Sequence, residues 1–101
     1  MIAVIVSGYF NPLHKGHLEL FDNAKTKGTE LWVIVNSDFQ RELKGSEAFM
    51  DQNERLDIVR SLKPVHRAFL SIDNDSTQCK TLSALHNFFS YDYSLTFANG
   101  G

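Results

Sequence analysis

Short segments with the character of β-strands recur four times along the chain. Residues 2–7 and 31–35 are continuous apolar runs rich in β-branched side chains, and residues 67–72 and 93–98 form two further candidate strands. Continuous apolar runs of this length are typical of strands buried on both faces, as in a parallel sheet. The pattern therefore predicts a sheet that lies in the interior of the protein.

Three amphipathic segments separate these strands. They cover residues 16–27, residues 52–62 and a segment that begins near Asp75, and their apolar side chains recur at helical spacing. Each segment is predicted to be a helix that packs against the sheet. The positions that share a face are Leu18, Phe21 and Ala24 in the first segment, Leu56, Val59 and Leu62 in the second, and Leu82, Leu85 and Phe89 in the third.

Polar residues and glycine mark the ends of these helices. Gly28 closes the first helix, and Asp51 and Glu54 have the spacing of a capping box at the start of the second. Asp75 or Ser76 is expected to cap the third helix. No regular element is predicted for the polar stretch 36–47.

Alternation of strands and helices in the order βαβαβαβ predicts an α/β fold. Right-handed crossovers between parallel strands give a Rossmann-like, doubly wound parallel sheet. We expect one domain over residues 1–101, incomplete at its carboxyl-terminal edge. In such sheets ligands bind beyond the carboxyl ends of the strands, where the strand order reverses. The functional site is therefore expected in the polar segments that follow the strands.

Charge and cysteine content narrow the class of partner and the compartment. The formal charge of -2 and the pI near 6.0 give no broad positive field, so a nucleic acid is not expected as a partner. The single cysteine, Cys79, excludes an intrachain disulfide. The apolar start is too short to span a membrane and lacks the features of a secretory signal. We expect a cytoplasmic protein that does not enter a membrane.

The segment between the first strand and the first helix carries the candidate chemistry. It reads Gly-Tyr-Phe-Asn-Pro-Leu-His-Lys-Gly-His over residues 8–17. Gly8 is expected to leave room for a ligand at the strand end, and Gly16 to keep the helix entrance free of a side chain. His14 and His17 are three residues apart, so both can face one anion at the helix amino terminus, where backbone amides and the helix dipole favour negative charge.

Two imidazoles in this position can donate hydrogen bonds to the phosphates of a nucleoside triphosphate as charge shifts during in-line attack. Two other interpretations stay open on the residues alone. One histidine can cap the helix while the other packs in the interior, or both can bind a metal ion. No further ligand lies nearby at a convincing spacing, so no metal site is predicted.

These residues resemble the signature of the HxGH nucleotidyltransferases, a superfamily that includes cytidylyltransferases and adenylyltransferases. The resemblance implies that His14 and His17 contact the triphosphate and stabilise the pentavalent transition state. Asn11 stands where many members have Asp, which is a mild departure. The further residues that the resemblance places in the nucleotide site are Gly8, Tyr9, Phe10, Asn11 and Gly16.

Later segments are similar in order and spacing to the glycerol-phosphate cytidylyltransferase and heptose-phosphate adenylyltransferase branches. They are Val-Asn-Ser-Asp at 35–38, Leu-Lys-Gly at 43–45 and Asn-Glu-Arg-Leu at 53–56. By this resemblance Lys44 acts in catalysis by reaching phosphate oxygens, and Arg55 supports the same anionic pocket. On the residues alone, a solvated Lys44 and an Arg55 that pairs on its own helix stay open. The triphosphate is expected to carry Mg2+.

The resemblance implies an enzyme that transfers a nucleoside monophosphate from CTP or ATP to a phosphorylated small molecule and releases pyrophosphate. Gly100 lies where a Gly-Gly-Asp type turn of the family begins to contact the nucleotide, so we expect the chain to be the amino-terminal part of the domain. The alternative is a nucleotide-binding or dimerisation module without turnover. A homodimer is expected because part of the sheet would be uncovered. A fragment of a class I aminoacyl-tRNA synthetase is disfavoured by the length and the acidic pI.

Overall fold

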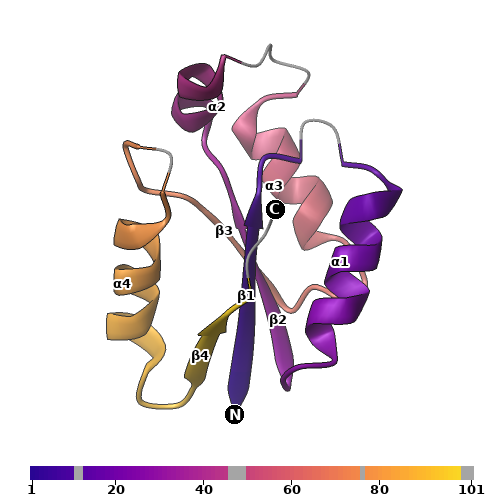
Figure 1. Ribbon diagram of the computed structural model, residues 1–101, viewed down its shortest axis with the longest axis vertical. Helices are drawn as coiled ribbons and strands as arrows, with labels where there is room; N and C mark the ends of the chain where they lie inside the picture. The colour runs from indigo at the N-terminus through magenta and orange to yellow at the C-terminus, as the bar shows by residue number, and fades with distance from the viewer. Residues whose placement is uncertain (11–12, 46–49, 76, 99–101) are drawn as a thin grey trace.

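Four parallel strands form one sheet at the centre of the molecule (Figure 1). The computed structural model describes residues 1–10, 13–45, 50–75 and 77–98, apart from the side chain of Lys44. β1 pairs with both β2 and β4, and β2 pairs with β3, so the order across the sheet is β3-β2-β1-β4. The strands are β1 (Ile2–Gly8), β2 (Glu30–Val35), β3 (Arg67–Leu70) and β4 (Ser94–Phe97).

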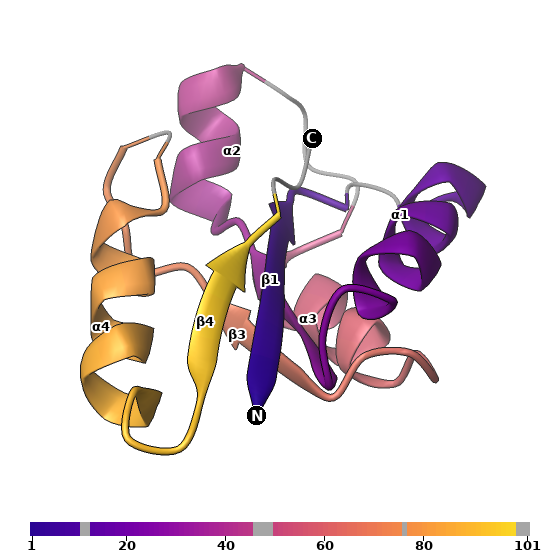
Figure 2. The same ribbon diagram turned by 60° about the horizontal axis from the view of Figure 1, so that its bottom comes forward.

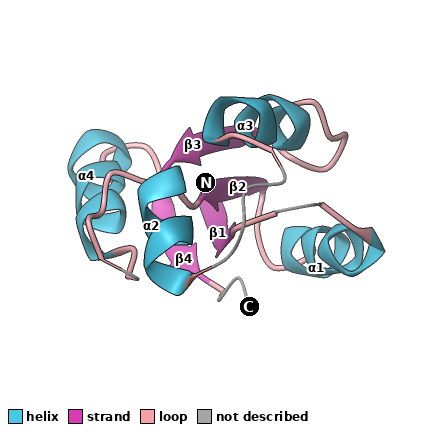
Figure 3. Ribbon diagram, turned by 90° about the horizontal axis from the view of Figure 1, so that it is seen from above, coloured by secondary structure: helices cyan, strands magenta, loops and turns pink. Residues whose placement is uncertain are grey.

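Helices cover both faces of this sheet. Figures 2 and 3 show α1 (Lys15–Lys25) and α3 (Gln52–Arg60) on one side of the strands and α4 (Cys79–Phe89) on the other. The short helix α2 (Asp38–Lys44) lies beyond the carboxyl ends of the strands, at the top of Figure 1. The predicted Rossmann-like, doubly wound α/β fold is confirmed, with each predicted helix and strand present and small differences at their ends.

The two cores are built from alternating residues of the same strands, because successive side chains of a strand point to opposite faces. Each valine, leucine, isoleucine or phenylalanine side chain in these cores stabilises the fold by about 1.5–3 kcal/mol when it is fully buried. The face under α1 and α3 contains Val4, Val6, Leu31, Val33 and Val35, packed with Phe21 of α1 and Val59 of α3. The face under α4 contains Ala3, Ile5, Trp32 and Ile34, packed with Leu85 of α4.

α2 is a helix that the apolar pattern does not predict. Ser37 begins it through a capping box: the Ser37 hydroxyl accepts from the Gln40 N–H at 3.2 Å, and Gln40 Oε1 accepts from the Ser37 N–H at 3.0 Å. Gly45, with φ of 82°, ends the helix in the left-handed conformation. The large apolar side chains Phe39 and Leu43 are exposed, so burial of an apolar stripe does not hold this helix in place.

A buried amide fastens α2 to the segment that precedes α4. The Gln40 side chain is fully buried, and its Nε2 donates to the carbonyls of Asp75 and Thr77 at 2.8 and 3.0 Å. Its Oε1 is already used in the capping box. Gln40 therefore joins two segments that follow neighbouring strands.

The cap of α4 differs from the prediction. Asp75 accepts hydrogen bonds from the N–H and hydroxyl of Thr77 in its own loop, and Ser76 lies outside the described residues. The buried carboxylate of Asp73 instead accepts from the amides of Lys80 and Thr81 at 2.8 and 2.9 Å. Burial by itself would raise the pKa of Asp73, but these hydrogen bonds and the one from the Thr81 hydroxyl hold it below its usual value. Gln78, at the N-cap position, makes no side-chain capping bond, so the Asp73 carboxylate takes over the capping of these first-turn amides.

Across the ranges 1–10, 13–45, 50–75 and 77–98, no helix is long and apolar enough to cross a bilayer.

Replacing Asp73 with Ala should lower the free energy of unfolding by about 2 kcal/mol, because two helix amides lose a charged acceptor. Asp75→Ala is the matched control and should cause a smaller loss, since the Asp75 side chain bonds within an exposed loop. Denaturant unfolding of both variants measures the difference. If the Asp75 variant lost more stability than the Asp73 variant, the assignment of the cap would be wrong.

Candidate functional site

Two histidines cap the amino terminus of α1 by accepting hydrogen bonds from backbone amides of the same motif. His14 Nδ1 accepts from the Gly16 N–H at 3.1 Å, and His17 Nδ1 accepts from the His14 N–H at 3.1 Å. The arrangement is a capping box in which imidazole nitrogens take the positions that hydroxyl and carboxylate oxygens usually fill. The His17 amide also reaches the His14 carbonyl at 2.9 Å. These bonds hold the backbone of the motif in one conformation.

The two rings stack on each other, with centroids 3.9 Å apart and planes 28° from parallel. Each Nδ1 already accepts an amide proton, so in the neutral ring the proton sits on Nε2. Both rings therefore present an N–H donor on the edge away from the helix backbone. A pair of such donors at a helix amino terminus suits an anion that carries several oxygens.

Burial lowers the pKa of His17 below its ordinary value, and the neighbouring charge on His14 lowers it further. The neutral form is thereby favoured near neutral pH. Protonation at Nδ1 would also remove the acceptor of the His14 N–H. The cap and the neutral state of His17 therefore support each other.

Gly16 leaves room for the His14 ring at the helix entrance, and its contact with a nucleotide stays a prediction. A Cβ at this position would lie 2.9 Å from Cε1 and 3.1 Å from Nδ1 of His14. Real Cβ atoms show essentially no contacts under 3.0 Å. A side chain at residue 16 would push the His14 ring out of the stack.

Gly8 and Phe10 are placed differently from the prediction. A Cβ on Gly8 would lie 2.8 Å from Cζ of Phe10, so the space above Gly8 is filled by the protein's own phenyl ring rather than left for a ligand. Phe10 is 1% exposed and belongs to the core under α1. Its side chain therefore cannot contact a bound nucleotide in this conformation, and only its backbone remains near the site.

Phe10 also has a left-handed backbone, with φ of 52°. This conformation costs a bulky residue about 1–2 kcal/mol. Burial of the ring offsets that strain, since full burial of a phenylalanine contributes about 1.5–3 kcal/mol. The left-handed conformation of Phe10 directs its ring back over Gly8, at the end of β1.

Arg55 is predicted to support the anion pocket. In the structure its side chain instead connects the segments that follow two strands. Its buried guanidinium donates from one nitrogen to the carbonyls of Tyr9 and Asn36, at 2.6 and 2.8 Å. A second nitrogen forms an ion pair with Asp38 at 2.8 Å, and Nε donates to the Met50 carbonyl at 3.3 Å. Arg55 therefore stabilises the segments that leave β1 and β2 and does not form part of an anion pocket in this conformation.

Asp38 positions Arg55 and the start of α3. In the sequence it stands out only as the last residue of the segment 35–38, which is similar to the family. Burial by itself would raise the pKa of this carboxyl, but the Arg55 guanidinium, the Gln52 amide and the charge on Arg41 bring it below its usual value. Asp38 and Gln52 also bond reciprocally, amide to side chain, at 3.0 and 3.2 Å. The start of α2 is thereby joined to the start of α3.

The remaining predicted site residues are only partly described. The Tyr9 carbonyl is held by Arg55, next to the histidine motif. Asn11, Gly100 and the side chain of Lys44 lie outside the described residues, so their predicted contacts stay predictions. Among the residues that are described, no three His, Cys, Asp or Glu side chains gather in a way that could hold a metal ion.

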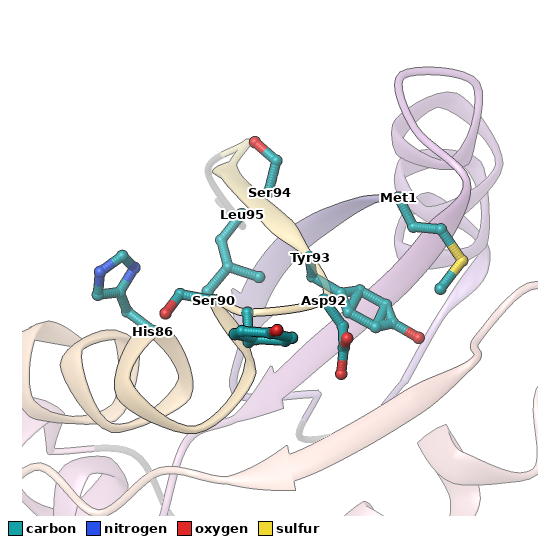
Figure 4. Close-up of a pocket in the computed structure, with 8 residues that line it drawn as sticks. Met1, His86, Ser90, Asp92, Tyr93, Ser94 and Leu95 are labelled. Atoms are coloured by element: carbon teal, nitrogen blue, oxygen red, sulfur yellow. The ribbon is translucent and has the colours of Figure 1, made fainter.

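A hollow of about 490 Å³ lies at the opposite end of the sheet (Figure 4). Met1, at the start of β1, lines it together with residues from the end of α4 and the start of β4, among them His86, Tyr93 and Leu95. The histidine motif follows the carboxyl end of β1. This hollow therefore lies away from the stacked histidines and forms no part of their site.

Replacing His17 with Gln should flatten the dependence of stability on pH. Gln at this position can still accept the His14 N–H but does not titrate. Because the pKa of His17 is lowered by folding, the unfolded chain binds more protons below pH about 6.5, and the native chain loses stability as the pH falls. Between pH 8 and pH 5, Tm should fall further in the native chain than in the variant. Equal falls would show that His17 does not titrate in this way.

Replacing Arg55 with Met should lower the free energy of unfolding of the ligand-free chain by about 3–5 kcal/mol, because Asp38 loses its charged partner and three carbonyls lose a donor. Arg60→Met, on the exposed face of the same helix, removes one hydrogen bond to the Ala68 carbonyl and should cost about 1 kcal/mol or less. Chemical denaturation compares them. An Arg55 variant of native stability that binds triphosphate poorly would instead indicate a ligand contact.

Several known proteins are similar to this chain. An FAD synthase of Thermoplasma acidophilum is 37% identical over 75 residues, which cover 74% of this chain and 53% of that protein. An FAD synthase of Methanoculleus marisnigri is 40% identical over 70 residues, which cover 69% of this chain and 46% of that protein. The chain therefore spans about half the length of these curated relatives.

A solved structure has the same fold over the whole chain. The crystal structure of the lipopolysaccharide core biosynthesis protein from Thermoplasma volcanium GSS1 superposes with a TM-score of 0.77 at 24% identity, covering 100% of this chain and 97% of that one. At this identity the likeness shows the fold alone. The profile of the cytidylyltransferase-like family, in contrast, matches the sequence itself over residues 5–94. On this match and the FAD synthase relatives, the chain belongs to the cytidylyltransferase-like family.

Proposed function

We propose that this chain forms the triphosphate-binding part of a nucleotidyltransferase. The observation that carries the proposal is the stacked pair of His14 and His17, each with Nδ1 occupied and Nε2 free to donate. A triphosphate offers oxygens on adjacent phosphates, which two neighbouring donors can bind together. The amino terminus of α1 adds the positive end of its dipole at the same place.

In the proposed reaction an oxygen of the acceptor phosphate attacks the α-phosphorus of the nucleotide. The bond between the α-phosphorus and the bridging oxygen to the β-phosphate breaks, and pyrophosphate leaves with the electron pair. His14 and His17 stabilise the negative charge that grows on the phosphate oxygens. Because each Nδ1 is held by an amide, the rings act as fixed hydrogen-bond donors and move no proton.

The relatives favour ATP as the nucleotide and flavin mononucleotide as the acceptor. FAD consists of an adenosine monophosphate joined through phosphates to flavin mononucleotide, and the two curated relatives above are FAD synthases. CTP with glycerol phosphate is the second pair to test, in line with the resemblance carried by the later motifs. We assign phosphate contacts to Lys44, Asn11 and Gly100, and expect Mg2+ to enter with the triphosphate, held mainly by phosphate oxygens and water.

A binding module without turnover is the second candidate. It is favoured by the histidine pair itself, in which both rings are fixed hydrogen-bond donors that bind an anion and move no proton. We also propose a cytoplasmic homodimer in either case. Sedimentation at high concentration tests the dimer, and a stable monomer would contradict it.

Pyrophosphate release, measured with each nucleotide and acceptor pair, distinguishes the two candidates. The enzyme predicts release with ATP and flavin mononucleotide, and a loss of about 100-fold or more in kcat when either histidine is replaced by Ala. His86→Ala is the matched control, because this exposed histidine lies on α4 at the far end of the sheet, and it should keep full activity. Triphosphate binding without release would favour the module, and no triphosphate binding would contradict both.

A further inference from the structure

We propose that Phe10 is a positioning residue that fixes the orientation of the His17 ring, and through it the direction of one of the two Nε2 donors. The inference rests on the proposed function for the identity of the ligand, and on geometry alone for the action of Phe10 on His17. Orienting His17 is a different role from filling the core and from contacting the nucleotide directly.

The His17 ring is in contact with two other aromatic rings. On one face it stacks on His14, with centroids 3.9 Å apart. Phe10 meets it nearly at right angles, with centroids 4.8 Å apart and an interplanar angle of 78°. Edge-to-face contacts at this distance are attractive and directional. The two contacts leave the His17 ring little freedom to rotate about its bond to Cβ.

Phe10 is itself held from two other directions. Phe21 of α1 packs against it at a centroid distance of 5.5 Å, and the tip of its ring rests on the bare backbone of Gly8. The closest approach to a Cβ at Gly8 would be 2.8 Å, so the ring can lie this low only over glycine. The absence of a side chain at Gly8 therefore determines how close the Phe10 ring lies to the backbone of β1. The Phe10 ring in turn fixes the orientation of the His17 ring.

The left-handed backbone of Phe10 is a second observation that points to a role at the site. A residue that only fills the core can do so from an ordinary extended backbone, whereas Phe10 has a φ of 52°. Strained backbone of this kind concentrates at functional sites, where the surrounding structure compensates for it. Here the reversed turn is what brings the ring from the end of β1 to the side of His17.

Rotation of the His17 ring would change the site in two ways. Turning it over by half a turn removes Nδ1 from the His14 N–H, which loses its acceptor. The same movement changes the direction of the His17 Nε2 donor relative to that of His14. A triphosphate would then meet one fixed donor instead of two, although the helix and the fold would persist.

The first test compares Phe10→Leu with Val59→Ala, a variant of the same core that lies on α3 and makes no described ring contact with His17. Long-range proton–nitrogen spectra of the ligand-free histidines report which nitrogen carries the proton. We expect the native chain and the Val59 variant to show His17 with bare Nδ1 and protonated Nε2. In the Phe10 variant the Nδ1 and Nε2 signals of His17 should both move to intermediate positions, because the ring exchanges between the two neutral tautomers.

ATP affinity, measured by calorimetry, is the second readout. Phe10→Leu should weaken ATP binding about tenfold, as expected for one misaligned hydrogen bond to a charged group, while Val59→Ala should stay within about twofold of the native chain. Failure of the native chain to bind ATP would contradict the proposed function, but the ligand-free spectra would still decide the action of Phe10.

Gly8→Ala provides an independent variant that leaves Phe10 in place. The added methyl group should displace the Phe10 ring and produce the same averaging at His17, although Gly8 is not itself in the histidine pair. In the double variant with Phe10→Leu no ring remains to displace, so the two effects should not add. Native His17 spectra in Phe10→Leu and in Gly8→Ala, or fully additive losses of ATP affinity, would overturn the proposal.

Discussion

Two hydrogen bonds from backbone amides to imidazole nitrogens determine what the site can do. They take Nδ1 of His14 and of His17, so the proton of each neutral ring sits on Nε2. The same bonds cap α1, which makes the start of the helix and the chemistry of the site one structure. A change that breaks the cap therefore also disturbs the donors, and a change in protonation weakens the cap.

The sheet positions this cap through polar contacts at its carboxyl edge. Arg55 bonds to carbonyls that follow β1 and β2 and pairs with Asp38, so the histidine loop, α2 and α3 are fixed to one another. Gln40 extends the network to the segment before α4. Several of these groups are buried and would be costly to leave unpaired. The polar edge of the fold is therefore as specific as its apolar core.

The apolar pattern was sufficient to predict the strands, three helices and the order of the fold, because β1 and β2 are buried on both faces and read as continuous runs. It could not predict α2, whose apolar residues Phe39 and Leu43 are exposed; the available signal was the spacing of Ser37 and Gln40. The histidine pair follows from local spacing. The roles of Phe10 and Arg55 could not be predicted from local spacing. The role of Phe10 depends on a left-handed backbone conformation, and that of Arg55 on contacts with residues distant in sequence.

A crystal structure of the chain with bound ATP would test the central claim most directly. Membership of the cytidylyltransferase-like family and the paired donors predict phosphate oxygens within about 3 Å of Nε2 of both His14 and His17, with each Nδ1 still bonded to its amide. A triphosphate bound elsewhere, for example in the hollow beside Met1 and Leu95, would contradict it. So would a phosphate that displaces an amide from either Nδ1.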